Sequence, residues 1–183
     1  MGNASAQDKL AQYYFYLLFV PKCARYYAEK AAHQGEMTSQ YVLAQLIKDS
    51  GSNEVEVFWL YTLAAFQGSA KGRFALGMHY IESHRLIETG DEDWRMNMLL
   101  TVYWFGKTAE VGAKTPERYQ SMAMMTLHLD DAMKEWHPKR VSDPLSGYSH
   151  ISFITWALDK GGKYTDMISS IAFGNVNVPA AGA

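Results

Sequence analysis

The stretch that decides the fold is Ala24-Arg-Tyr-Tyr27-Ala-Glu-Lys-Ala31-Ala32-His-Gln-Gly35, because its pattern returns twice along the chain. It comes back as Val57-Phe-Trp-Leu60-Tyr61-Thr-Leu-Ala64-Ala65-Phe-Gln-Gly68. It returns more loosely as Thr101-Val-Tyr-Trp104-Phe105-Gly-Lys-Thr108-Ala109-Glu-Val-Gly112. A recurring aromatic helix that ends in Ala-Ala-x-x-Gly is typical of stacked helix pairs, in which each pair buries its apolar face on its neighbours. Such an architecture presents a surface rather than enclosing a catalytic centre, so the pattern predicts a binding protein.

A second helical pattern accompanies the first. Ser39-Gln-Tyr41-Val-Leu43-Ala44 follows Gly35, and Gly72-Arg-Phe74-Ala-Leu76-Gly77 follows Gly68. Ala11-Gln-Tyr13-Tyr-Phe15-Tyr16 is a similar segment near the start. Apolar residues at helical spacing indicate one buried face, on which Ala44 and Gly77 are expected to let a neighbouring backbone come close. Gly35, Gly68 and Gly112 are expected to end their helices in left-handed caps.

The spacing of the glycines indicates where the repeats differ. Gly68 follows Gly35 by 33 residues, Gly112 follows 44 later, and Gly161 follows 49 later. The extra residues fall between paired helices, at 83–93 and 134–147, where insertions leave the stacking intact.

These patterns predict nine helices in a single domain over 1–174, with a flexible tail at 175–183. Pro21 suits a first helical turn, and Asp91 or Asp93 suits an N-cap before Trp94. The predicted helices span about 7–19, 22–34, 36–49, 54–67, 69–83, 93–111, 115–135, 147–160 and 163–173.

Composition narrows the class of protein. The 183 residues are 48% hydrophobic and 20% charged, which indicates a folded chain. A net charge of -2 and a pI near 6.3 give no electrostatic reason to expect nucleic acid as a partner. The single cysteine, Cys23, excludes an internal disulfide and is expected to be a buried, inert thiol.

No integral membrane segment is expected, because the longest apolar run, residues 13–20, is too short to span a bilayer. The opening Met-Gly-Asn-Ala-Ser-Ala-Gln has no charged leader or apolar region. It fits a cytoplasmic protein or a mature periplasmic chain whose signal or lipoprotein leader was removed, and its small polar residues favour the periplasm.

The quoted residues resemble the Sel-one-like repeat (SLR) family, relatives of tetratricopeptide repeats. Residues 68–80 match the first half of the family pattern, and residues 24–35 match the second half. The resemblance covers residues 11–125 and, more weakly, 148–161. It implies an all-α, right-handed α-solenoid of stacked antiparallel helix pairs, with about four repeats, a C-terminal capping helix and a concave groove. Family members are adaptors, scaffolds and binding proteins. Some bacterial members are immunity proteins that block secreted toxins, including type VI phospholipase effectors.

The sequence predicts no catalytic residues, metal site or cofactor. His79 and His84 lie five residues apart, off one helical face, and no H-E-x-x-H occurs. Gly106-Lys107-Thr108 lacks the earlier glycine of a phosphate loop and lies within a helical pattern. No G-x-S-x-G is present. The sequence does not exclude a pair of carboxylates for glycoside hydrolysis.

Candidate partner-binding residues lie between the positions that the repeat pattern assigns to packing. Packing positions are Tyr27, Tyr41, Tyr61, Phe74 and Tyr80. The helical candidates are Tyr14, Gln45, Met78, His79 and Glu82. Trp94 and Trp136 flank the inserted loops and are expected to be exposed. Asp91, Glu92 and Asp93 form either a solvated helix N-terminus or a docking patch for a basic partner. Met78, Met122, Met124 and Met125 form either an adaptable groove or internal packing.

The leading hypothesis is a non-enzymatic protein-protein interaction module, and within that class a bacterial immunity protein that blocks a secreted toxin. A scaffold that bridges two proteins is the alternative, and a cell-wall hydrolase is a remote one. The sequence names neither the partner nor the oligomeric state.

Overall fold

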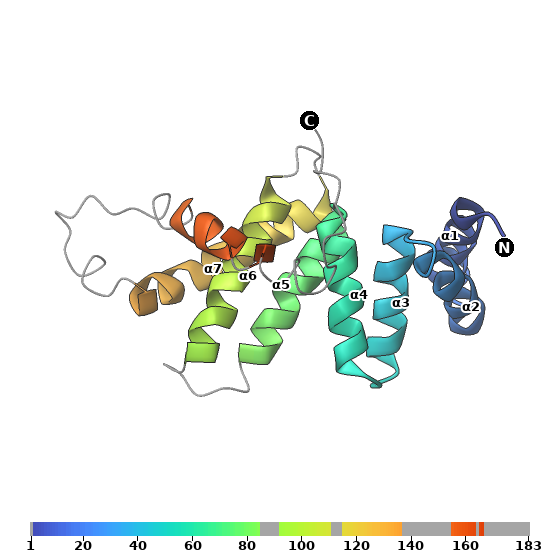
Figure 1. The fold of residues 1–183 in the computed structure, drawn as a ribbon, viewed down its shortest axis with the longest axis horizontal. Helices are drawn as coiled ribbons and strands as arrows, with labels where there is room; N and C mark the ends of the chain where they lie inside the picture. Colours follow the sequence, from blue (N-terminus) through green and yellow to red (C-terminus); the bar gives the residue numbers. More distant parts are fainter. Residues whose placement is uncertain (1, 85–91, 111–114, 137–154, 164, 167–183) are drawn as a thin grey trace. The chain divides into compact units, whose positions relative to one another are not determined.

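The computed structural model describes residues 2–84, 92–110, 115–136, 155–163, 165 and 166, and all regular structure within these ranges is helical (Figure 1). The prediction of an all-α fold is therefore confirmed for this part of the chain. The elements are α1 (Ala4–Gln12), the π-helix η1 (Tyr13–Leu17), α2 (Pro21–Ala32), α3 (Met37–Asp49), α4 (Glu54–Phe66), α5 (Ala70–His84), α6 (Glu92–Ala109) and α7 (Pro116–Trp136). Residues 155–163 are also helical.

The predicted helices from 22–34 to 115–135 agree with α2 to α7 within two residues at either end. Pro21 occupies the first turn of α2, as predicted. The first helix differs, because it begins at Ala4 and its last turn is the π-helix η1, which ends at Leu17 rather than at residue 19. Asp93 lies inside α6, and Asp91 lies outside the described residues.

The predicted helix break after residue 160 is wrong, because the helix continues through Gly161 and Gly162. Gly161 serves close packing instead: a Cβ placed there would lie 2.6 Å from the Cβ of Tyr103. The remaining parts of the predicted helices 147–160 and 163–173 lie outside the described residues.

The chain forms two compact units, residues 1–75 and 76–183, and the boundary falls inside α5. The single domain over 1–174 stays a prediction. The predicted tail at 175–183 lies outside the described residues.

In the first unit, α1, α2, α3 and α4 pack in sequence order, and α1 also packs on α3 (Figure 1). Small residues make the close approach possible, since Ala24, Ala28 and Ala31 of α2 and Ala44 of α3 are fully buried. The predicted close approach of a neighbouring backbone to Ala44 stays a prediction. Of the predicted packing positions in this unit, Tyr61 is buried, and Tyr27, Tyr41 and Phe74 are half-buried.

The glycine caps recur with the 33-residue spacing of the sequence. Gly35 and Gly68 have φ of +92° and +97°. Each donates its N–H to the carbonyl three residues back, and the following residue donates to the carbonyl five residues back, at 3.0–3.1 Å. This is the Schellman arrangement, so the two predicted caps are confirmed. Gly51 closes α3 in the same way with φ +66°, a cap that the repeat pattern did not identify. Gly112 lies outside the described residues.

A pair of glutamine side chains recurs with the same spacing. Gln34 Nε2 donates to Gln7 Oε1 at 2.6 Å, and Gln67 Nε2 donates to Gln40 Oε1 at 2.8 Å. Both members of the second bond lie 33 residues beyond those of the first. The sequence repeat is therefore accompanied by a repeated polar contact between helices of this unit.

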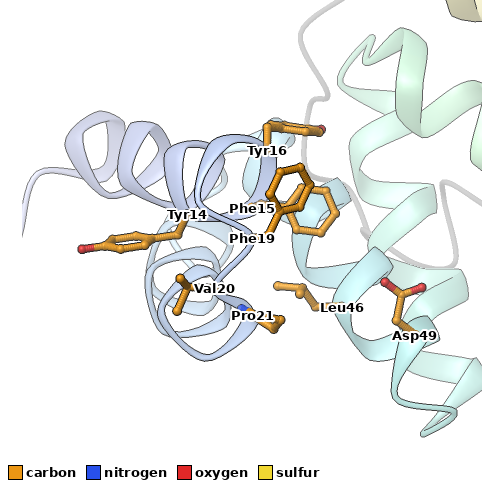
Figure 2. Close-up of a pocket in the computed structure, with 8 residues that line it drawn as sticks. All are labelled: Tyr14, Phe15, Tyr16, Phe19, Val20, Pro21, Leu46 and Asp49. Atoms are coloured by element: carbon orange, nitrogen blue, oxygen red, sulfur yellow. The ribbon is translucent and has the colours of Figure 1, made fainter.

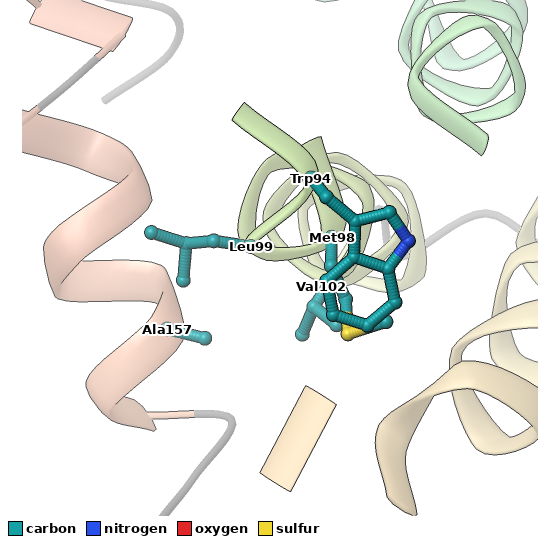
Figure 3. Packing of buried hydrophobic residues seen from close by; sticks show 5 residues of the cluster. All are labelled: Trp94, Met98, Leu99, Val102 and Ala157. Carbon is teal, nitrogen blue, oxygen red and sulfur yellow. The ribbon is translucent and has the colours of Figure 1, made fainter. Parts of the chain in front are cut away.

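In the second unit, α6 and α7 pack together, and Trp94, Met98, Leu99 and Val102 of α6 belong to one buried cluster with Ala157. Leu99 points toward the helix that carries Ala157, and Trp94 lies on the other side of α6 (Figure 3). Trp94 is 8% exposed, so the expectation that it lies on the surface is wrong. It begins the same helical stripe as Met98 and Val102, four and eight residues later. Gly77 packs on Phe105, since a Cβ there would lie 2.7 Å from the ring. The predicted close approach is therefore made by a side chain and not by a neighbouring backbone.

Candidate protein-binding surface

The most exposed apolar segment of the described chain is the connection between η1 and α2. Leu17, Leu18, Phe19 and Val20 are consecutive and all exposed, and Phe19 reaches 78%. Single exposed apolar residues are ordinary on protein surfaces, whereas a continuous run of four marks an interaction site or an aggregation hazard. We call these four residues the apolar corner.

The backbone of the apolar corner follows from Pro21. A residue before proline is driven out of the helical region, and Val20 has φ -107° and ψ 87°. The preceding helix must therefore end without continuing into α2. It ends in wide hydrogen bonds: Leu18 N–H donates to the Tyr13 carbonyl five residues back, as in a π-helix, at 3.2 Å, and Val20 N–H donates to the Tyr14 carbonyl six residues back at 3.0 Å.

Phe19 occupies the left-handed conformation that glycine occupies at three other helix ends. Its φ is +53°, and the glycines in the equivalent role are Gly35, Gly51 and Gly68. A residue with a Cβ pays roughly 1–2 kcal/mol in this conformation. Strain of this kind, like a π-helical turn, is found preferentially at functional sites.

A cleft of about 290 Å³ lies beside the apolar corner, between η1 and the C-terminal half of α3 (Figure 2). Figure 2 shows Phe15 and Phe19 on the side of η1 that faces α3, with Tyr14 pointing the other way. The volume of the cleft is close to the lower limit of small-ligand pockets, ~300 Å³, and is therefore suited to one inserted side chain. The lining residues are Tyr14, Phe15, Tyr16, Phe19, Val20, Pro21, Leu46 and Asp49.

One charge lies in this lining, the exposed carboxylate of Asp49 at the end of α3. Within the described ranges Asp49 has no ion-pair partner. Tyr16 already engages a cation, because Lys71 donates to its hydroxyl at 3.1 Å and lies 4.3 Å from its ring centroid. The cleft therefore combines aromatic walls with one carboxylate that forms no ion pair among the described residues, and the Lys71 ammonium lies at Tyr16 of the same lining.

Two sequence-predicted binding residues lie in the first unit. Tyr14 is half-buried and stacks on Tyr27, with ring centroids 5.6 Å apart and planes 3° apart. It contributes to the lining of the cleft. Gln45 is half-buried on α3 and donates to the Tyr61 hydroxyl at 2.9 Å, which gives it a packing contact between α3 and α4.

The other predicted residues lie in the second unit. Met78 and His79 are half-buried on α5, Glu82 is exposed one turn later, and Asp93 is exposed at the start of α6. Trp94 is buried, as described above. Tyr80, a predicted packing position, is buried. Asp91 and the side chains of Glu92 and Trp136 lie outside what the structure describes, so the acidic patch stays a prediction.

The remaining side chains of interest have mixed environments. Cys23 is half-buried rather than buried, which corrects its expected burial. Met122 is exposed on α7, whereas Met125 packs against the Trp94 cluster. Among the described residues, no three His, Cys, Asp or Glu side chains are grouped closely enough to hold a metal ion. None of the described helices combines the length and apolar character needed to cross a bilayer.

Sequence reasoning missed the apolar corner, although a signal for it was present. The aromatic run 13–20 leads into Pro21 without a glycine, while the next three helices along the chain end at Gly35, Gly51 and Gly68. A non-glycine residue is then left to turn the chain in the left-handed conformation. Comparison of the chain with protein-family models, with curated proteins and with solved structures finds no match.

Proposed function

We propose that this chain is a non-enzymatic protein-binding module built as an SLR solenoid. The observation that carries the proposal is the apolar corner, where four consecutive apolar residues are exposed and Phe19 takes a conformation that disfavours it. Exposed aromatic side chains of this kind are typical anchors of protein interfaces. The proposal assigns no catalytic role to any residue of the chain.

The repeat architecture is supported by two features of the first unit. The first is a 33-residue spacing, which is shared by the sequence, by the Schellman caps and by the glutamine pairs. The second is the packing of α1 on α3 as well as on α2, which is expected where helix pairs stack. An SLR solenoid accounts for both features.

Within this class we favour an immunity protein that blocks a secreted toxin in the bacterial periplasm. The support is the SLR resemblance together with one concentrated apolar surface. A scaffold is the second candidate, and it is favoured by the separate exposed acidic residues Glu82 and Asp93 in the other unit. An inhibitor forms a complex with one partner, whereas a scaffold holds at least two at once.

The test is affinity capture of partners from the source organism with three forms of the whole chain: wild type, Phe19→Gly and Val55→Ser. Val55 is a matched control because it is 67% exposed on α4, outside the apolar corner. The expected result is one stoichiometric partner retained by wild type and Val55→Ser and lost by Phe19→Gly. Loss of that partner's toxic activity on mixing identifies an inhibitor, and two simultaneous partners identify a scaffold. Capture of no protein, or equal capture by all three forms, contradicts a binding role of the apolar corner.

A further inference from the structure

The cleft beside the apolar corner has a chemistry that selects one kind of side chain. Phe15 and Phe19 contribute aromatic rings to the lining, and Asp49 contributes a carboxylate from α3 (Figure 2). Of the described lining residues, Asp49 alone carries a charge, so a bound group that is apolar throughout would leave that charge facing it. A cationic group that is also planar can stack on the aromatic rings and pair with the Asp49 carboxylate.

We propose that the cleft binds an arginine side chain of the partner protein, presented next to an apolar residue that packs on Leu17 and Leu18. This inference rests on the proposed protein-binding function. The guanidinium stacks on an aromatic ring and donates paired hydrogen bonds to the Asp49 carboxylate. Arginine fits better than lysine because its planar guanidinium is more weakly hydrated and matches a carboxylate with two parallel donors.

The chain itself shows that its aromatic rings accept cations. Lys71 lies 4.3 Å from the Tyr16 ring centroid at one side of this region, and Lys30 lies 4.0 Å from that of Tyr26. Both ammonium groups also bond the tyrosine hydroxyl. Phe15 and Phe19 have no hydroxyl, so a cation on their rings needs its hydrogen-bond acceptor from elsewhere, and Asp49 supplies the charged acceptor of the lining.

The inference is tested by selecting displayed random heptapeptides with the whole chain and, in parallel, with Asp49→Asn. Wild type is expected to enrich peptides with arginine beside Leu, Ile, Phe or Met, and Asp49→Asn is expected to lose this enrichment. Asp166→Asn is the control, because Asp166 is an exposed carboxylate in the other unit. Selection of acidic or purely apolar peptides overturns the inference, as does identical selection by Asp49→Asn.

The best peptide is then compared with its citrulline version, which keeps the shape of arginine and removes its charge. Exposed ion pairs contribute up to about a fivefold change in affinity, so citrulline is expected to weaken binding severalfold in wild type and by a smaller factor in Asp49→Asn, where only the cation–ring contact is lost. Phe19→Leu, which keeps an apolar side chain without a ring, is expected to weaken the arginine peptide by a similar factor. Equal binding of both peptides to wild type overturns the inference.

The outcome separates this inference from the proposed function. A captured protein partner whose affinity is unchanged in Asp49→Asn leaves the function standing and removes the arginine site. If arginine peptides are selected but no protein partner is captured, the arginine site stands and the proposed protein-binding function is contradicted. A dimer of this chain that dissociates in Asp49→Asn identifies a second copy as the occupant and overturns the assignment to a partner protein.

Discussion

Replacement of Phe19 by glycine is expected to leave the stability of the chain almost unchanged. Glycine removes the cost of the left-handed conformation at φ +53°, roughly 1–2 kcal/mol. Against this, a glycine raises the entropy of the unfolded chain by an equivalent of about 0.5–1 kcal/mol. Phe19 is 78% exposed, so it buries roughly 40 Å² of the ~200 Å² of a phenylalanine, equivalent to about 1 kcal/mol. The three effects nearly cancel.

The comparison with alanine gives the sharper readout. Phe19→Ala loses the same buried area but keeps a Cβ in the left-handed conformation, so we expect Phe19→Gly to be more stable than Phe19→Ala by about 0.5–1 kcal/mol. Inside a helix the order is reversed, since alanine is favoured over glycine by about 1 kcal/mol. Tyr26, exposed in the middle of α2, is the matched position where alanine is expected to win.

The assay is urea unfolding of the four variants, Phe19→Gly, Phe19→Ala, Tyr26→Gly and Tyr26→Ala, followed by far-ultraviolet circular dichroism. Opposite orders of midpoint at the two positions support the reasoning. If Phe19→Ala is more stable than Phe19→Gly by about 0.5–1 kcal/mol, the left-handed strain is absent, and one of the two observations that single out the apolar corner is lost.

Three further predictions concern packing, and each is checked by the urea midpoint against wild type. Gly72→Ala is expected to cost about 1 kcal/mol despite the better helix propensity of alanine, because the new Cβ meets the backbone nitrogen of Ala65 at 2.9 Å; an unchanged or higher midpoint contradicts that contact. Trp94→Ala is expected to cost about 3 kcal/mol and to remove near-ultraviolet signal, since the indole is buried in a cluster against which Met125 of α7 packs; a cost below ~1 kcal/mol would contradict this burial. Ser39→Ala is expected to cost about 1–3 kcal/mol, because the Ser39 hydroxyl donates to the buried Asp8 carboxylate at 2.7 Å, and a neutral result means that Asp8 finds another donor.

The helices could be predicted because their signals are local. Apolar residues at helical spacing, Pro21 at a first turn and glycine after Ala-Ala-x-x act within a few residues of chain, and the structure follows them from α2 to α7. Gly35 and Gly68 adopt the predicted left-handed caps. These features need no knowledge of what packs against them.

The failures share a different physical origin. A glycine in this pattern can either cap a helix or allow another segment to pack closely. Gly161 takes the second role because Tyr103 packs against it. In the same way, Trp94 beside an inserted loop is exposed or buried according to whether its cluster is covered by another segment, as it is by Met125 of α7. Both outcomes depend on contacts between segments well separated in the sequence, which a local pattern does not encode.

The apolar corner is informative because several local rules fail there together and one substitution would restore them. The other capped ends of the first unit place glycine in the left-handed conformation, whereas the end at Phe19 has a π-turn, a strained backbone and an exposed ring. A glycine at this position would relieve the strain and remove the exposed ring at almost no cost in stability. Sequences that fold well are locally consistent, and their departures from consistency gather at functional sites. The phenylalanine is therefore better explained by what it contacts outside the chain than by what it contributes to the fold.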